Sequence, residues 1–144
     1  YTSEAIETIS GITKGYPFFI QQLCKIVYQN TDKVLIEKAD VESCIEEFLT
    51  TLDEGFFKSR YERCAESDKK FIFAMVKFGE LPCTISNVAH NLGKNVNSIF
   101  TTRAQLISKG IIYPVKYKEL DFTVPEFSGY IQRLEEYKQW DSQR

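Results

Sequence analysis

The chain has 144 residues, of which 43% are hydrophobic, 14% aromatic and 26% charged, and its formal net charge is −2. This composition excludes a collagenous chain, a disordered tail and a disulfide-rich scaffold. Its apolar stretches are far shorter than the roughly 18 residues that a membrane span needs, and no signal peptide opens it, so we expect a cytoplasmic protein with no membrane partner.

Two helices are predicted near the N-terminus. Ser3 can cap the first, isoleucines recur at positions 6, 9 and 12, and Gly15 ends it. Pro17 suits the first turn of the second helix, where its missing N–H would have no partner in any case. This helix runs to about residue 29, and its predicted buried face carries Ile20, Leu23, Cys24 and Val27.

A third helix is predicted after a turn at residues 30–33. Asp40 can cap it, and Gly55 interrupts the helical pattern. Its amphipathic face is formed by Val41, Ile45, Phe48, Leu49 and Leu52. We therefore expect a helical subdomain over residues 1–52, a connecting helix over residues 53–66 and a second domain over residues 67–144.

The second domain is predicted to contain three helices, a hairpin and a final helix, each bounded by a cap or a breaker. In chain order these are a helix over 68–78 (cap Ser67, stop Gly79), a helix through Asn91 (cap Thr84, turn Gly93), a helix to Gly110 (cap Asn95), strands at 111–116 and 121–124, and a helix from Pro125. This is the order of a winged helix-turn-helix. The predicted fold class is mainly α, a helical subdomain followed by a winged helix-turn-helix with a small β-hairpin wing.

The charges are unevenly distributed. Residues 1–51 carry four basic and eight acidic side chains, whereas residues 84–118 carry five basic side chains and no acidic one. The basic residues of the second stretch are Lys94, Arg103, Lys109, Lys116 and Lys118. They predict a local positive field within an acidic chain, and that field favours a polyanion as partner.

The third helix of a winged unit can enter the major groove of double-stranded DNA while the wing contacts the neighbouring backbone. Here that helix offers short hydrogen-bonding side chains, and cations flank it. The candidate DNA-binding residues are Lys94, Asn95, Asn97, Ser98, Thr101, Thr102, Gln105, Lys116 and Lys118. So few cations predict weak, salt-sensitive binding.

A protein-interaction or regulatory role for the winged unit stays open. The helix from Asn95 carries a single arginine, Arg103, whereas helices that recognise DNA commonly carry more. Arg103 can also pair with an acidic residue elsewhere. Tyr113 and Tyr117 alternate along the predicted strand, so we expect them to share a face and to pack in the core rather than to stack on bases.

Enzyme and metal signatures are absent from the sequence. It has no phosphate-binding loop, no dinucleotide fingerprint, no HExxH and no GxSxG. The four cysteines are dispersed and His90 is the only histidine, so we expect no metal site, and unclustered cysteines are typical of the reducing cytosol. No catalytic residue and no cofactor are expected within these residues.

Two sets of residues carry a family resemblance over nearly the whole chain. Residues 13–21, with Gly15, Tyr16 and Pro17, resemble the GxP-type segment in the helical lid of AAA+/STAND-type P-loop ATPases. The second half resembles the C-terminal winged helix of the prokaryotic members of that group, through Phe71–Met75 before Phe78-Gly79, Val88-Ala89 with Leu92-Gly93, Arg103 with Leu106-Ile107, residues 109–113, and residues 122–125 with Phe127.

The resemblance implies a parent ATPase that is longer than this chain. Residue 1 is tyrosine and the single methionine is Met75, which also fits a piece of a larger protein. The parent would bind ATP and Mg²⁺ in an N-terminal ATPase core, a partner of the lid, and Gly15, Tyr16 and Pro17 would lie near the adenine. Phe18 and Phe19 stand where some lids place an arginine, so a direct part of the lid in hydrolysis is not implied.

Overall fold

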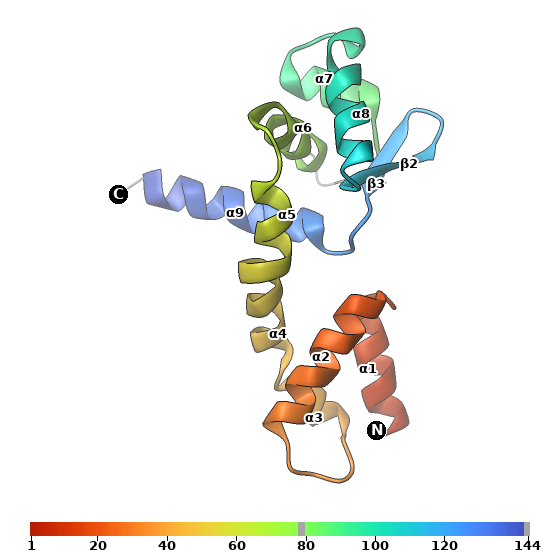
Figure 1. The fold of residues 1–144 in the computed structure, drawn as a ribbon, viewed down its shortest axis with the longest axis vertical. Helices are drawn as coiled ribbons and strands as arrows, with labels where there is room; N and C mark the ends of the chain where they lie inside the picture. Colours follow the sequence, from red (N-terminus) through yellow and green to blue (C-terminus); the bar gives the residue numbers. More distant parts are fainter. Residues whose placement is uncertain (78–79, 143–144) are drawn as a thin grey trace. The chain divides into compact units, whose positions relative to one another are not determined.

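The computed structural model describes residues 1–77 and 80–142. The fold is mainly helical (67%) with a small three-stranded antiparallel sheet, which confirms the fold class predicted from the sequence (Figure 1). The chain divides into two compact units, Tyr1–Lys58 and Ser59–Arg144, and the division falls within residues 53–66. Among the described residues, no helix is both long enough and apolar enough to cross a membrane.

The first unit begins with α1 (Ser3–Thr13). Its cap is Thr2 and not Ser3, because the Thr2 hydroxyl accepts a hydrogen bond from the Ala5 N–H at 3.1 Å. The buried positions recur every four residues at Ala5, Ile9 and Thr13, and Ile6 is exposed. Of the three isoleucines whose spacing predicted this helix, only Ile9 is buried, because the buried positions recur every four residues and not every three.

Helix α2 (Pro17–Asn30) begins at Pro17, as predicted. Its fully or nearly fully buried side chains are Phe19, Leu23, Ile26 and Val27. Ile20 and Cys24, which were predicted to be buried, are only half-buried. The buried face of α2 is thus rotated from the predicted one toward Phe19, whose ring is larger than the side chains that were predicted to be buried.

Two short helices, α3 (Lys38–Glu42) and α4 (Ile45–Thr51), replace the single predicted third helix. Asp40 does not precede α3 but lies inside it, and its carboxylate accepts a hydrogen bond from the Glu37 N–H at 2.9 Å. The predicted amphipathic face is buried at Val41, Phe48 and Leu52, half-buried at Ile45 and exposed at Leu49.

The helical path continues through Gly55 instead of stopping there. Residues Leu52–Phe57 form the π-helical segment η1, and α5 (Lys58–Glu62) follows directly. A π-helix widens the turn, so it accommodates the change of pattern that the sequence shows at Gly55 without ending the helix. Phe57 is fully buried in this segment.

The second unit has the winged helix-turn-helix order. Helix α6 (Glu66–Val76) is followed by β1 (Cys83–Thr84), α7 (Ile85–Leu92), the 3₁₀ segment η2 (Val96–Ile99), α8 (Phe100–Ser108), β2 (Ile112–Lys116), β3 (Glu119–Phe122) and α9 (Phe127–Ser142). The sheet order is β1-β3-β2, with both pairs antiparallel. Strand β1 was not predicted, because two residues carry no strand pattern of their own.

Several predicted boundaries of this unit shift by a few residues. Helix α6 is preceded by Ala65 and not by Ser67, and α9 begins at Phe127 and not at Pro125. The β3 strand begins at Glu119 and the hairpin turn is correspondingly shorter. The predicted helix end at Phe78 and Gly79 lies outside the described residues.

The core of the second unit lies between its helices and the sheet. Helix α6 packs against α7, α8 and α9, and α8 also packs against β2. The largest fully buried side chains are Phe71, Ile72, Met75, Leu106, Ile112, Leu120 and Phe127. Helix α9 packs on α6, and Thr101, Ala104 and Gln105 of α8 are exposed.

Candidate nucleic-acid interface

A groove of about 580 Å³ is lined by residues of α7, η2, α8 and the β2–β3 hairpin. Figure 1 shows α8 and the hairpin. Arg103, Lys116 and Lys118 supply its charges, and none of its lining residues is acidic. The remaining lining residues are Ile85, Ser86, Val96, Phe100, Pro114 and Tyr117. The groove therefore has an apolar floor and a cationic rim.

The start of η2 is fixed by a local cap. The Asn95 side-chain oxygen accepts a hydrogen bond from the Ser98 N–H at 3.0 Å, and the Ser98 hydroxyl donates to the Asn95 carbonyl at 2.8 Å. Asn95 is the predicted cap, but it caps the 3₁₀ segment η2, whereas α8 is preceded by Ile99. The side chains of Asn95 and Ser98, two of the candidate DNA-binding residues, are therefore engaged in hydrogen bonds that orient η2.

The other polar candidates of this helix lie along its outer side. Asn97, Thr101 and Gln105 are spaced by four residues and are exposed, and Thr102 is half-buried. Positions four apart share one face of an α-helix, so Thr101 and Gln105 lie on one face of α8. Together with Asn97 of the preceding 3₁₀ segment η2 they are called the polar stripe. Val96, Phe100 and Arg103 form the neighbouring stripe that lines the groove.

The wing is short and anchored to the helices. Lys118 adopts a positive φ of 65° in the turn, and its carbonyl accepts a hydrogen bond from the Ile85 N–H at 3.0 Å. The Lys118 ammonium nitrogen lies 5.2 Å from the centroid of the Tyr117 ring. The tip of the wing is thus held beside the first residue of α7.

Tyr113 and Tyr117 do not pack in the core, so that prediction was wrong. Tyr113 is 43% exposed and Tyr117 is 88% exposed. The pairing of β2 with β3 shifts register between Pro114 and Lys116, and Tyr117 lies in the turn beyond the strand. The simple alternation on which the prediction depended therefore ends before Tyr117.

The basic stretch 84–118 does not act as one surface. Lys94 lies in the turn between α7 and η2, outside the lining of the groove. The Lys109 ammonium pairs with the fully buried Asp68 carboxylate, which raises the pKa of Lys109. Within residues 1–77 and 80–142, no ion pair involves Arg103. Of these two basic residues it is therefore Lys109, and not Arg103, that pairs with an acidic residue.

Only Lys116 and Lys118 of the nine lining residues were candidate DNA contacts, and three of the seven others carry an aromatic or charged side chain. Phe100, Arg103 and Tyr117 line the groove but were not among the candidate DNA contacts. The spacing of Val96, Phe100 and Arg103 is helical, and this signal could have placed them on one face. Tyr117 could not be found in this way, since its position depends on the bulge in the hairpin.

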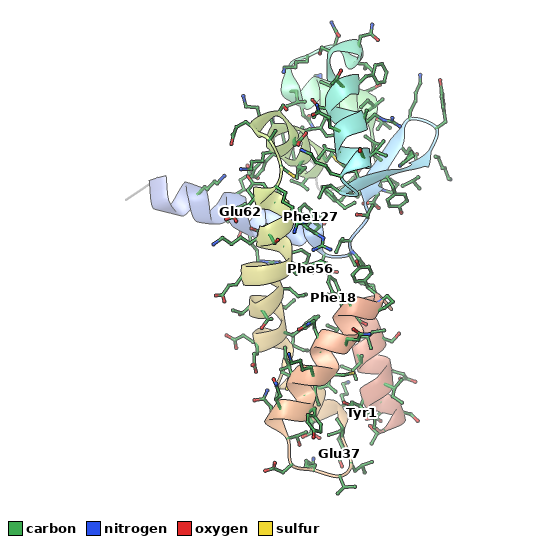
Figure 2. All side chains as sticks on the ribbon, in the orientation of Figure 1. Tyr1, Phe18, Glu37, Phe56, Glu62 and Phe127 are labelled. Carbon is green, nitrogen blue, oxygen red and sulfur yellow. The ribbon has the colours of Figure 1, made fainter. Side chains whose placement is uncertain are left out.

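The candidate lid turn lies between α1 and α2 of the first unit. Gly15 has φ of 72°, Tyr16 precedes α2 and Pro17 is its first residue. The half-buried Tyr16 ring meets the Phe19 ring edge to face, with centroids 4.8 Å apart. Phe18 stacks on Phe56 with centroids 4.7 Å apart, and Figure 2 labels both side chains. The turn is therefore backed by an aromatic cluster.

Fold and groove together define a winged helix-turn-helix unit with a cationic cleft beside its third helix. The chain belongs to the family described as domain of unknown function DUF8462, whose model matches residues 54–131, more than half of the chain. No curated protein and no solved structure matches the chain. Among the described residues, no three histidine, cysteine or acidic side chains are grouped as metal ligands.

Proposed function

We propose that the winged-helix unit binds double-stranded DNA, with α8 in the major groove and the wing along the phosphate backbone. The observation that carries this proposal is the groove between α8 and the wing, where Arg103, Lys116 and Lys118 converge and no acidic residue is among the lining. Phosphate contacts supply most of the affinity of such a surface, and they position the helix for base contacts.

The polar stripe of Asn97 in η2 and Thr101 and Gln105 in α8 would meet base edges. An α-helix fits the major groove, and amide side chains can pair there with adenine, whereas hydroxyls accept or donate according to the base. Arg103 would lie between this stripe and the wing. We therefore place sequence reading on the stripe and backbone binding on the cations.

The first test is a titration of the full chain with duplex DNA at several salt concentrations. Lys116→Glu/Lys118→Glu is expected to weaken binding at least tenfold at low salt and to reduce the slope of log K against log salt by about 2, since each phosphate contact contributes about 0.9. Fluorescence anisotropy with a labelled duplex measures both quantities.

The matched control is Lys25→Glu/Lys70→Glu, which makes the same change of charge at two exposed lysines outside the groove. It should keep most of the affinity and the salt slope. An equal loss in both double variants would mean that DNA senses only net charge, and it would contradict a specific role for the groove.

A protein partner is the second candidate function, and the apolar floor of the groove favours it. Val96 and Pro114 offer apolar surface there, and Tyr113 and Val115 are exposed on β2. Such a module would dock on an ATPase core or on another protein. Regulation of the parent that persists when duplex binding is abolished by Lys116→Glu/Lys118→Glu would favour this function over DNA.

We also infer that residues 1–52 act as the lid of a longer ATP-binding protein of the AAA+/STAND type. The support is that the Gly15-Tyr16-Pro17 turn resembles the GxP-type segment in the lid of these ATPases. The turn is exposed at Gly15 and Pro17, and aromatic rings pack behind it. This turn would contact adenine, while the phosphates and Mg²⁺ would be bound by the ATPase core. The residues described here would bind but not hydrolyse the nucleotide.

In the full-length polypeptide, Tyr16→Ala is expected to weaken ATP binding by about tenfold or less, the scale of one aromatic contact. Tyr16→Phe keeps the ring and should bind ATP as the unmodified protein does. Equilibrium binding of a fluorescent ATP analogue measures the effect. A full-length protein without a phosphate-binding loop would contradict the inference.

A further inference from the structure

We propose that the groove between α8 and the wing takes an unpaired nucleotide, so that the preferred ligand is a duplex interrupted by a gap. This inference rests on the proposed function, because it names the class of DNA that the same surface prefers. Phe100 and Tyr117 are the two aromatic side chains that line the groove, and the proposed duplex contacts give their rings no stacking partner.

Both rings line the groove and are open to solvent. Phe100, at the first position of α8, is 47% exposed, and Tyr117, in the wing turn, is 88% exposed. Exposed aromatic rings beside cations are the usual platform for single-stranded nucleic acid, because every base has a face that can stack. In an intact duplex those faces are covered by neighbouring base pairs, so an unpaired base is needed to use the rings.

The groove matches the two halves of a nucleotide. Its volume of about 580 Å³ lies within the range of small-molecule sites, roughly 300–1,000 Å³. The apolar floor suits a flat base, and the cationic rim of Arg103, Lys116 and Lys118 suits the flanking phosphates. An acidic peptide would satisfy the charges, but it would leave both rings without a stacking partner.

The wing holds Tyr117 in place for this role. The Ile85 N–H donates to the carbonyl of Lys118, the next residue, and the Lys118 ammonium lies over the Tyr117 ring at 5.2 Å from its centroid. Most of the ring surface remains accessible, and a cation already stands beside it. A base stacked on Tyr117 would therefore bring its own phosphate close to Lys118 without a rearrangement of the turn.

The experiment compares a blunt duplex with the same duplex carrying a short internal gap, each titrated with the full chain by fluorescence anisotropy. The gapped duplex is expected to bind about tenfold more tightly, the lower part of the range for stacking on one or two rings. Tyr117→Ala and Phe100→Ala should each remove most of this preference, so that the ratio of the affinities for the gapped and the blunt duplex falls toward one.

Two variants and one spectroscopic signal sharpen the test. Tyr117→Trp keeps a stacking face and should keep the preference, and Tyr28→Ala removes an equally exposed tyrosine from α2 and should change nothing. A fluorescent adenine analogue placed in the gap should be quenched on binding, and Tyr117→Ala should abolish the quenching.

The outcomes separate this inference from the proposed function. Equal affinity for the two duplexes, or a preference that survives Tyr117→Ala/Phe100→Ala, would overturn the inference and leave duplex binding intact. Displacement of the gapped duplex by poly-glutamate as readily as by DNA would overturn it in favour of an acidic protein. Failure of every DNA to bind at low salt would overturn the proposed function as well.

Discussion

Replacing Asp68 by alanine is expected to lower the free energy of unfolding of the winged-helix unit by about 2–3 kcal/mol, the scale of hydrogen bonds to a buried charged group. The Asp68 carboxylate is fully buried, and one of its oxygens, Oδ2, accepts hydrogen bonds from the Ala65 N–H at 3.0 Å and from the Lys109 ammonium. The substitution removes the cap of α6 and the ion pair that joins α6 to the end of α8. Urea unfolding followed by circular dichroism measures the loss.

Lys109→Met separates the ion pair from the cap. It leaves the Asp68 carboxylate buried without its counter-charge, and the other carboxylate oxygen, Oδ1, already lacks a hydrogen-bond partner among the described residues. Lys109→Met should therefore destabilise the unit more than Asp68→Asn/Lys109→Met does, since the double variant buries no charge and keeps an acceptor for Ala65.

Lys70→Met is the matched control, because it removes an exposed lysine from α6. It should change the unfolding free energy by less than about 0.5 kcal/mol. If Lys109→Met behaves as Lys70→Met does, the pairing with Asp68 contributes nothing. In that case Lys109 would belong with the free cations of the basic stretch.

The pair also explains why the sequence overstated the basic surface. Asp68 and Lys109 are 41 positions apart, and no local pattern links them. Counting charges between residues 84 and 118 treats Lys109 as free, although the fold neutralises it from outside that range. The convergence of Arg103, Lys116 and Lys118 is likewise a product of the hairpin register, and the sequence alone contains no measure of it.

Some features with a local cause were predicted correctly. The caps at Thr84 and Asn95 depend on a side chain that reaches an N–H three residues ahead, and Gly93 takes a left-handed conformation with φ of 66°. The order of helices and hairpin follows from such signals. This is why the winged helix could be recognised before its contacts were known.

The wrong starts of α3 and α6 share a different cause. Asp40 and Asp68 both lie at the third position of a helix and reach back to the N–H of the residue before it. An acidic residue in the first turn satisfies the same backbone groups as a cap that precedes the helix. Sequence therefore locates the start of a helix but not which of the neighbouring polar residues does the capping.

In the first unit, Phe19→Ala is expected to cost about 3–5 kcal/mol of unfolding free energy, the usual range for a buried phenylalanine. Phe19 is fully buried, and its ring meets those of Tyr16, Phe48, Phe56 and Phe57 at centroid distances of 4.8, 6.0, 5.4 and 6.0 Å. A unit of this length has a stability of only about 3–9 kcal/mol by the usual figure per residue, so the loss would unfold much of it.

The neighbouring residue is the control for this prediction. Phe18 is 39% exposed and makes one stacked contact, with Phe56 at 4.7 Å between centroids, so Phe18→Ala should cost no more than about 1.5 kcal/mol. Amide hydrogen exchange over residues 1–58 distinguishes the two variants, since Phe19→Ala should abolish protection in α1 and α2 that Phe18→Ala retains. Equal losses would mean that the aromatic cluster is not the core of this unit, because the exposed ring would then contribute as much as the buried one.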